Sequence, residues 1–242
     1  FVTDVSGMHI LLRLSGFSVP AFDLFRIKGT SYLLNILNYN LALAMMAAAL
    51  SRHAKKGIGT AGSPFVFLLF VDLCALSMQA LAGLWFAGSP FPAEPTWILL
   101  FVCAGGLLSP FVLWGVARIQ NAPGWMSRIL DHSLWSSFRA IGLSGIFLLL
   151  GVRALLLMAY LVMNFCFLRV FDIGVPFERM LVYSPILSLV GFIPISISGI
   201  GSTQVVMRFF YAAYVPVGLD AVATVDACST VALLSVLMVR IG

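Results

Sequence analysis

Polar side chains interrupt several long apolar stretches of this chain. They are Asp72, Gln79, Arg153, Gln204, Arg208 and Asp226. If these stretches cross a membrane, such groups face the interior of the bundle or a water-filled cavity, because lipid solvates them poorly. Arg153 and Arg208 then either bind an anionic group of a ligand or are neutralised by an aspartate of the same bundle. Both interpretations stay open from the sequence.

The composition favours a membrane protein. Of 242 residues, 61% are hydrophobic and 10% are charged, whereas soluble domains carry about 25% charged residues. Several apolar runs match the length of a membrane-spanning helix, and no strand-like alternation is present. We therefore expect an all-α polytopic bundle, a single transmembrane domain over residues 1–242, with about five to seven spans and one or two re-entrant hairpins.

The apolar stretch 183–201 is too broken for one plain helix. Its interruptions are Pro185, Gly191, Pro194, Gly199 and Gly201. Irregular backbone at membrane depth is tolerated only where protein or a water-filled cavity shields it. The pattern predicts a re-entrant segment, a type of element that often holds a transported substrate.

A second candidate re-entrant segment is the apolar run 31–51. Basic residues flank it on both sides, which conflicts with a single crossing because Lys and Arg favour the cytoplasmic side. It is either a re-entrant hairpin or a plain span with one basic end outside. Asn35, Asn38 and Asn40 either line a cavity or hydrogen-bond between helices. Two hairpins that enter from opposite faces would form an inverted repeat.

The other elements follow from runs of apolar residues. Residues 1–30 indicate an interfacial segment or the remnant of a preceding span, and we expect that a piece before Phe1 is missing. We predict spans at 64–87, 96–117, 141–170 and 219–240, a helix at 203–216, and an amphipathic interfacial helix within 118–139.

Several functions are disfavoured. Ser196 and Ser198 lack a base for nucleophilic catalysis, because the three histidines lie outside the predicted spans and Lys28 is placed in a loop. We expect no enzyme activity, no cofactor and no metal site, and the four cysteines as free thiols. The net charge of +5 indicates contact with anionic lipids and not with nucleic acid.

The segment FIPISISGIGSTQ, residues 192–204, resembles the transmembrane domain of the lysylphosphatidylglycerol synthase flippase family. The resemblance extends more loosely from about residue 30 to the end of the chain. It implies a bundle with two re-entrant hairpins of inverted symmetry that moves a lipid between leaflets. The residues that it places at the hairpin tip are Pro194, Ser196, Ser198, Gly199 and Gly201, and Gln204 stands where the family has an acidic residue.

Two functions follow as hypotheses. The first is a translocator of a lipid or another amphiphile, in a bacterial inner membrane, with membrane lipids as its partners. Its expected substrate-binding residues are Pro194, Ser196, Ser198, Gly199, Gly201, Gln204, Arg208, Arg153, Asn35 and Asn38. The second is an accessory subunit without transport activity that packs against other membrane subunits. A hydrated centre lined by the arginines favours the first, and a dry, filled centre favours the second.

Overall fold

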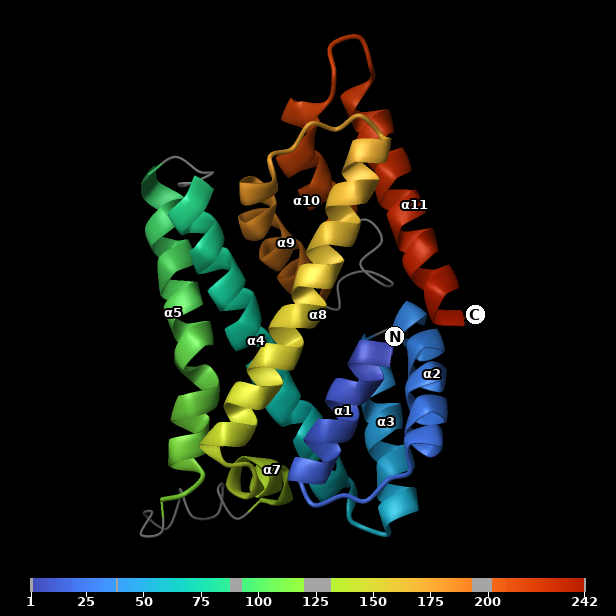
Figure 1. The fold of residues 1–242 in the computed structure, drawn as a ribbon, viewed down its shortest axis with the longest axis vertical. Coiled ribbons are helices and arrows are strands. Elements are labelled where there is room, and N and C mark those ends of the chain that lie inside the picture. Colours follow the sequence, from blue (N-terminus) through green and yellow to red (C-terminus); the bar gives the residue numbers. More distant parts are fainter. Residues whose placement is uncertain (1, 38, 88–92, 120–131, 193–201, 242) are drawn as a thin grey trace.

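The computed structural model describes residues 2–37, 39–87, 93–119, 132–192 and 202–241. These residues form helices and connecting turns, with no strand among them, so the predicted all-α class is confirmed. Figure 1 shows the helices arranged along one long direction of the molecule.

The first three helices are short and lie at one end of the molecule, which we call the lower end from its place in Figure 1. They are α1 (Val2–Leu14), α2 (Ala21–Leu37) and α3 (Tyr39–Ala54). Helix α1 ends where Gly16 adopts a positive φ of 75°, a conformation that glycine reaches without a steric penalty. The chain then reverses, so that α2 runs back up beside α1 and α3 descends beside α2.

Three long helices follow in the middle part of the chain. They are α4 (Ile58–Ala87), α5 (Ala93–Val116) and α8 (Leu143–Val170). Their apolar stretches at Ile58–Ala87, Leu99–Val116 and Leu143–Val170 are long enough to cross a membrane. Three of the predicted spans are thus supported. The first begins earlier than predicted, because Pro64 lies inside α4.

The connection between α5 and α8 holds a short 3-10 helix, η1 (Ser133–Trp135), and α7 (Ser136–Ala140). Part of the predicted amphipathic helix, residues 120–131, lies outside the described residues. In the part described, Phe138 is buried and its ring packs edge-on against that of Phe67, with centroids 5.0 Å apart. This end of the segment is therefore anchored to the bundle by an aromatic contact.

The last helices are α9 (Phe177–Phe192), α10 (Ser202–Tyr211), the 3-10 helix η3 (Ala212–Tyr214) and α11 (Ala221–Ile241). The predicted break at Pro185 is wrong, because α9 continues through it. Helix α11 is preceded by Asp220, whose carboxylate accepts hydrogen bonds from the backbone N–H groups of Val222 and Ala223 at 2.9 and 3.2 Å. This is the N-cap arrangement that an aspartate favours.

The fold contains two helical hairpins that enter the molecule from opposite ends. The first hairpin, α2 and α3, occupies the lower part, and the second hairpin, α9 and α10, the upper part (Figure 1). The contacts of each hairpin also correspond. The second helix of each hairpin packs on the long helix that follows it, α3 on α4 and α10 on α11. The first helix of each hairpin contacts the long helix of the other half, α2 on α11 and α9 on α4. This correspondence is that of an inverted repeat, and it supports the hairpin alternative for the run 31–51.

Each hairpin has its own apolar core. Met8, Leu12 and Leu50 belong to the lower cluster, and Met180 and Tyr211 to the upper one. A third cluster, beside the lower one, joins α4, α8 and the segment around α7. The two ends of the bundle are therefore packed separately and share the long helices α4 and α8.

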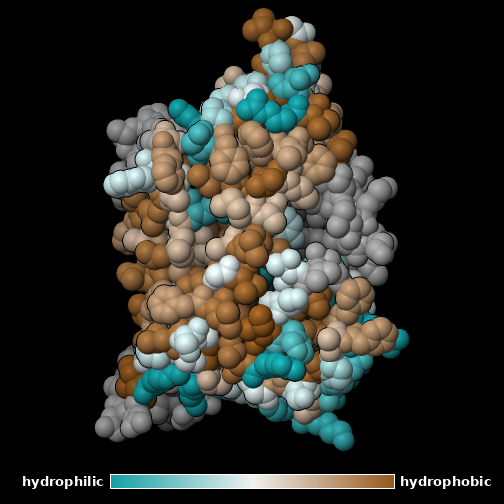
Figure 2. All heavy atoms as spheres, viewed as in Figure 1, coloured by the Kyte–Doolittle hydropathy of each residue, from teal (hydrophilic) through white to brown (hydrophobic). Residues whose placement is uncertain are grey.

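The outer surface is largely apolar between two polar ends. Figure 2 shows hydrophobic residues over most of the visible face, with hydrophilic residues gathered at its lower and upper ends. Large exposed apolar side chains line α5 and α8: Phe101, Leu108, Val112, Phe147 and Leu155. Exposed apolar surface of this extent is a membrane contact in a protein with spans of this length.

The first residues, expected as an interfacial segment or the remnant of a preceding span, pack against the bundle. Helix α1 packs against α8, and Met8, Leu11 and Leu12 are at most 1% exposed. Lys28, expected in a loop, lies inside α2 and is 8% exposed. Part of the segment belongs to the packed interior, because these apolar side chains are covered by other helices and the buried Asp4 and Lys28 pair with each other.

Candidate functional site

A buried group of charged and polar side chains lies where four helices meet. Arg153 of α8 is held between two carboxylates: its Nη1 donates to Oδ1 of Asp4 at 3.0 Å, and its Nε lies 3.0 Å from Oδ1 of Asp72. The side chains of Arg153, Asp4 and Asp72 are 9%, 8% and 17% exposed. One guanidinium thus bridges α1 and α4 in the interior.

Two residues of α2 complete the group. Lys28 Nζ lies 3.0 Å from Oδ2 of Asp4, and the hydroxyl of Tyr32 donates a hydrogen bond to the same oxygen. We call Asp4, Lys28, Tyr32, Asp72 and Arg153 the charge cluster. Its two acids and two bases give no net charge when all four are ionised, which limits the cost of burying them.

The helices place the charge cluster near the middle of the long direction. Asp72 stands midway along α4, and Asp4 lies in the first turn of α1, whose N-terminal end is at mid-height in Figure 1. A Cβ atom added to Gly7 would lie 3.0 Å from Cγ1 of Val152. The glycine therefore permits the close approach of α1 to α8 that brings Asp4 to Arg153.

The two carboxylates have unequal surroundings. Asp4 is bound by Lys28, Tyr32 and Arg153, whereas Asp72 is paired with Arg153 alone among the described residues. Asp72 is also the more exposed of the two. Asp4 is thus the fixed anion of the charge cluster, and Asp72 is the one whose single ion pair can be exchanged for another contact.

A free hydrogen-bond donor lies further along α4. The amide nitrogen of Gln79 is buried and has no hydrogen-bond partner among the residues that the structure describes. Gln79 follows Asp72 by seven residues, which places it on the same helical face about 10 Å away along the axis. A buried donor without a partner is costly, so this position is a candidate contact for a ligand's acceptor oxygen.

The other predicted arginine is paired nearer the surface. Arg208 of α10 donates to both carboxylate oxygens of Asp226 on α11, with Nε 2.6 Å from Oδ1. The two side chains are 42% and 31% exposed. The neutralising interpretation of the sequence therefore holds for both arginines in this structure: Asp226 pairs with Arg208, and Asp72 pairs with Arg153.

The predicted site residues are only partly brought together. Gln204 is half-buried on α10, one turn before Arg208. Asn35 lies in α2 and Asn40 in α3, and no side-chain position is described for either. The predicted tip residues Pro194, Ser196, Ser198, Gly199 and Gly201, together with Asn38, lie outside the described residues.

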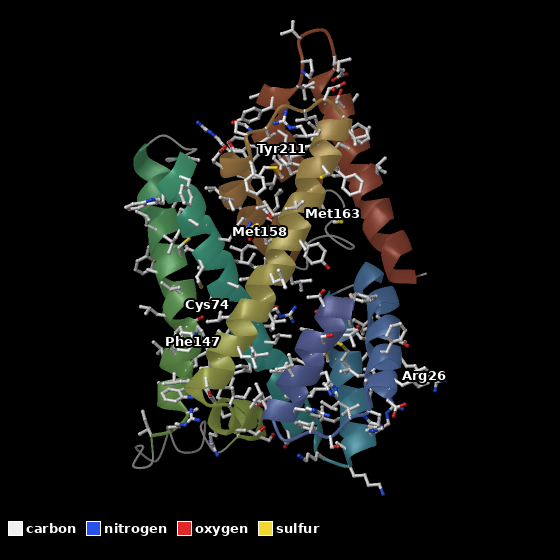
Figure 3. The ribbon with its side chains drawn as sticks, in the orientation of Figure 1. Arg26, Cys74, Phe147, Met158, Met163 and Tyr211 are labelled. Atoms are coloured by element: carbon white, nitrogen blue, oxygen red, sulfur yellow. The ribbon has the colours of Figure 1, made fainter. Side chains whose placement is uncertain are left out.

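Sequence reasoning missed three members of the charge cluster: Asp4, Lys28 and Tyr32. The sequence held one indication that Lys28 could point inward. Lys28 stands two residues after Arg26, and residues at this spacing do not share one face of a helix. Figure 3 shows Arg26 pointing away from the bundle, and its guanidinium lies over the ring of Phe22 at 4.3 Å. The partner Asp4 is separated from Lys28 by a chain reversal that local patterns did not predict.

Other chemistry finds little support in the part of the chain that is described. No group of three potential metal ligands occurs there. All four cysteines are free, and three of them are buried. A pocket of about 560 Å³ lies at the turn between α1 and α2, lined by His9, Arg13 and residues 16–21, so it is separate from the charge cluster.

No family model, curated protein or solved structure matches this chain. The charge cluster and the two hairpins are therefore the basis for assigning a function.

Proposed function

We propose that this protein moves an anionic amphiphile, with a phosphate-containing lipid as the simplest candidate, between the two leaflets of a membrane. The observation that carries the proposal is the charge cluster at mid-height, beside the first hairpin. Ionisable groups at that depth are costly and commonly mark a path for a polar or charged substrate.

The arrangement of the hairpins supports the same function. Elements that end at mid-depth leave helix termini and irregular backbone where a substrate headgroup must pass. The charge cluster draws on α2 of the first hairpin, and its helices α4 and α8 also contact α9 of the second. A shift of one hairpin against the other would therefore change the surroundings of Arg153.

The charge distribution supports an orientation for this transporter. The lower end carries Arg52, Lys55, Lys56, Arg118 and Arg139, all exposed. The upper end has a mixture of acids and bases around Arg169, Asp172 and Glu178. Because basic loops favour the cytoplasmic side, the lower end would face the cytoplasm, as expected for a bacterial inner membrane.

Arg153 is the candidate headgroup contact. Its guanidinium can pair with a phosphate as it now pairs with carboxylates, through directed N–H donors. Gln79 would supply a further donor on the same face of α4 as Asp72. The acyl chains would remain in lipid beside the exposed apolar surfaces of α5 and α8.

The second candidate function is that of an accessory subunit in a membrane complex. The pairing of Arg153 and Arg208 with carboxylates of the same chain favours it, because a purely structural role in holding the bundle together is enough to explain such pairs. The large apolar outer surface would then pack against other membrane subunits. The two candidates differ in whether the isolated chain moves lipid.

A leaflet-resolved assay in proteoliposomes tests the proposal. The rate at which a labelled anionic phospholipid becomes accessible from outside is compared between the wild type, Arg153→Met, Arg208→Ala and the surface control Leu155→Ala. We expect a wild-type rate above that of protein-free vesicles, a loss of that rate in Arg153→Met, a lowered rate in Arg208→Ala, and no change in Leu155→Ala. A wild-type rate equal to that of protein-free vesicles would refute the translocator and favour the subunit.

A further inference from the structure

The charge cluster has an asymmetry that the proposed function does not by itself require. Asp4 is bound by three side chains from two helices, whereas Asp72 depends on the Nε of Arg153. The guanidinium holds Asp4 through Nη1 and Asp72 through Nε. One of the two contacts can therefore be released while Arg153 stays anchored to α1.

In the described part of the chain, the charged groups near Asp72 come from three helices. Arg153 from α8 is in contact with Asp72. Asp4 from α1 pairs with the same arginine, and Lys28 from α2 pairs with Asp4. The hydroxyl of Tyr32, from α2, donates to Asp4. On α9, the charged residues Glu178 and Arg179 stand in the first turn, at the upper end.

The charge cluster has no excess positive charge that could neutralise an anionic ligand. The charge cluster is neutral with four ionised groups, so an anionic headgroup that entered beside Arg153 would add an uncompensated negative charge in the interior. Such a charge is expensive there. One proton added to Asp72 compensates this negative charge. It also frees the Nε donor of Arg153 from its ion pair with Asp72.

We propose that Asp72 takes up a proton when Arg153 binds an anionic phosphate headgroup, so that the headgroup and the proton are bound together. This inference rests on the proposed function. The contact from Arg153 Nε to the Asp72 carboxylate is broken, a contact from the same nitrogen to a phosphate oxygen is formed, and the proton from solvent resides on an Asp72 oxygen. Charge is balanced, because the proton offsets the headgroup.

The pH dependence follows from this exchange. Because binding takes up a proton, the affinity for an anionic phospholipid rises as the pH falls, by up to about tenfold per pH unit. Asp72→Asn resembles the protonated carboxyl in shape and charge. Its affinity should therefore be independent of pH, and it should take up no proton.

Calorimetric titration of the purified protein in an uncharged detergent measures the coupling. A short-chain phosphatidylglycerol is added in two buffers of different ionisation enthalpy, and the difference in binding heat gives the number of protons taken up per lipid. Glycerol phosphate serves as the soluble phosphate, and a short-chain phosphatidylcholine as the lipid without net charge. The variants are Asp72→Asn, the conservative Asp72→Glu, and Asp226→Asn as the matched control on α11.

We expect the wild type, Asp72→Glu and Asp226→Asn to take up one proton with each phosphatidylglycerol, and Asp72→Asn to bind this lipid without proton uptake. Uptake with glycerol phosphate as well would identify the phosphate group itself as the ligand, and uptake with phosphatidylglycerol alone a lipid. Binding without proton uptake by the wild type, equal uptake by Asp72→Asn, or no binding of either phosphate ligand by the wild type would overturn the proposal.

Lipid movement recorded in proteoliposomes of the same preparation separates this inference from the proposed function. Translocation by the wild type together with a binding heat that is independent of the buffer overturns the proton coupling and leaves the translocator standing. Absence of translocation by the wild type overturns the proposed function and the coupling with it.

Discussion

Replacement of Arg153 by methionine is the perturbation whose effect follows most directly from the structure. It keeps an apolar side chain of similar length in α8 and removes the cation that lies 3.0 Å from both Asp4 and Asp72. Asp4 keeps Lys28 at 3.0 Å and the Tyr32 hydroxyl. Asp72 loses its ion pair and remains in the interior, and this orphaned carboxylate is the main cost.

The size of the effect can be estimated. Removing one partner of a buried ion pair costs about 3–5 kcal/mol. For a protein of this length that corresponds to a drop in the unfolding midpoint of roughly 6–20 °C. The double variant Asp72→Asn/Arg153→Met removes both charges, so it should be more stable than Arg153→Met by at least about 1 kcal/mol.

Thermal unfolding in detergent, followed by intrinsic fluorescence, provides the measurement. Arg208→Met is the matched control, because its ion pair with Asp226 is partly exposed, and exposed pairs contribute little. A midpoint for Arg153→Met within about 2 °C of the control would refute the buried role of this ion pair. So would a double variant whose loss is the sum of the two single losses.

Three further results are expected. Gly83→Ala should lower stability by about 1–3 kcal/mol, because the added Cβ would lie 2.8 Å from a backbone nitrogen of α9. The control Gly105→Ala should not lower it, because its Cβ would meet no atom within 4 Å. Equal midpoints of the two variants in thermal unfolding would contradict the close packing of α4 on α9. In a variant without native cysteines, Gly7→Cys and Val152→Cys should form a disulfide on mild oxidation, seen as a mobility shift on gels, and failure to cross-link would contradict the contact of α1 with α8. Lys55→Cys should react with a membrane-impermeant maleimide only from the cytoplasmic side, and labelling of intact cells would reverse the proposed orientation.

The sequence was sufficient for the class of fold and most helices. Long apolar runs predicted the three helices of spanning length because length and composition are local properties. The basic residues on both sides of 31–51 left a re-entrant hairpin and a plain span open, and the helix contacts favour the hairpin. Pro185 misled, because a proline in a helix packed among others is tolerated more readily than in water.

The charge cluster could be predicted only in part. Asp72 and Arg153 stood out as charges in apolar surroundings, and pairing of Arg153 with an aspartate was one of the open alternatives. Asp4 and Lys28 did not stand out, because each lies in a short segment of mixed composition. Their burial results from the chain reversal between α1 and α2 and from the contact of α1 with α8, and such long-range contacts leave no periodic pattern in the sequence.

The most direct test of the central claim is the rate of phospholipid exchange between leaflets in vesicles that contain only the wild-type protein. We expect faster exchange of phosphatidylglycerol than in protein-free vesicles. We expect a smaller acceleration for phosphatidylcholine, because its choline cation offsets the phosphate charge that would pair with Arg153 at mid-depth. Exchange no faster than in protein-free vesicles, or equal acceleration of both lipids, would contradict a headgroup path past the charge cluster.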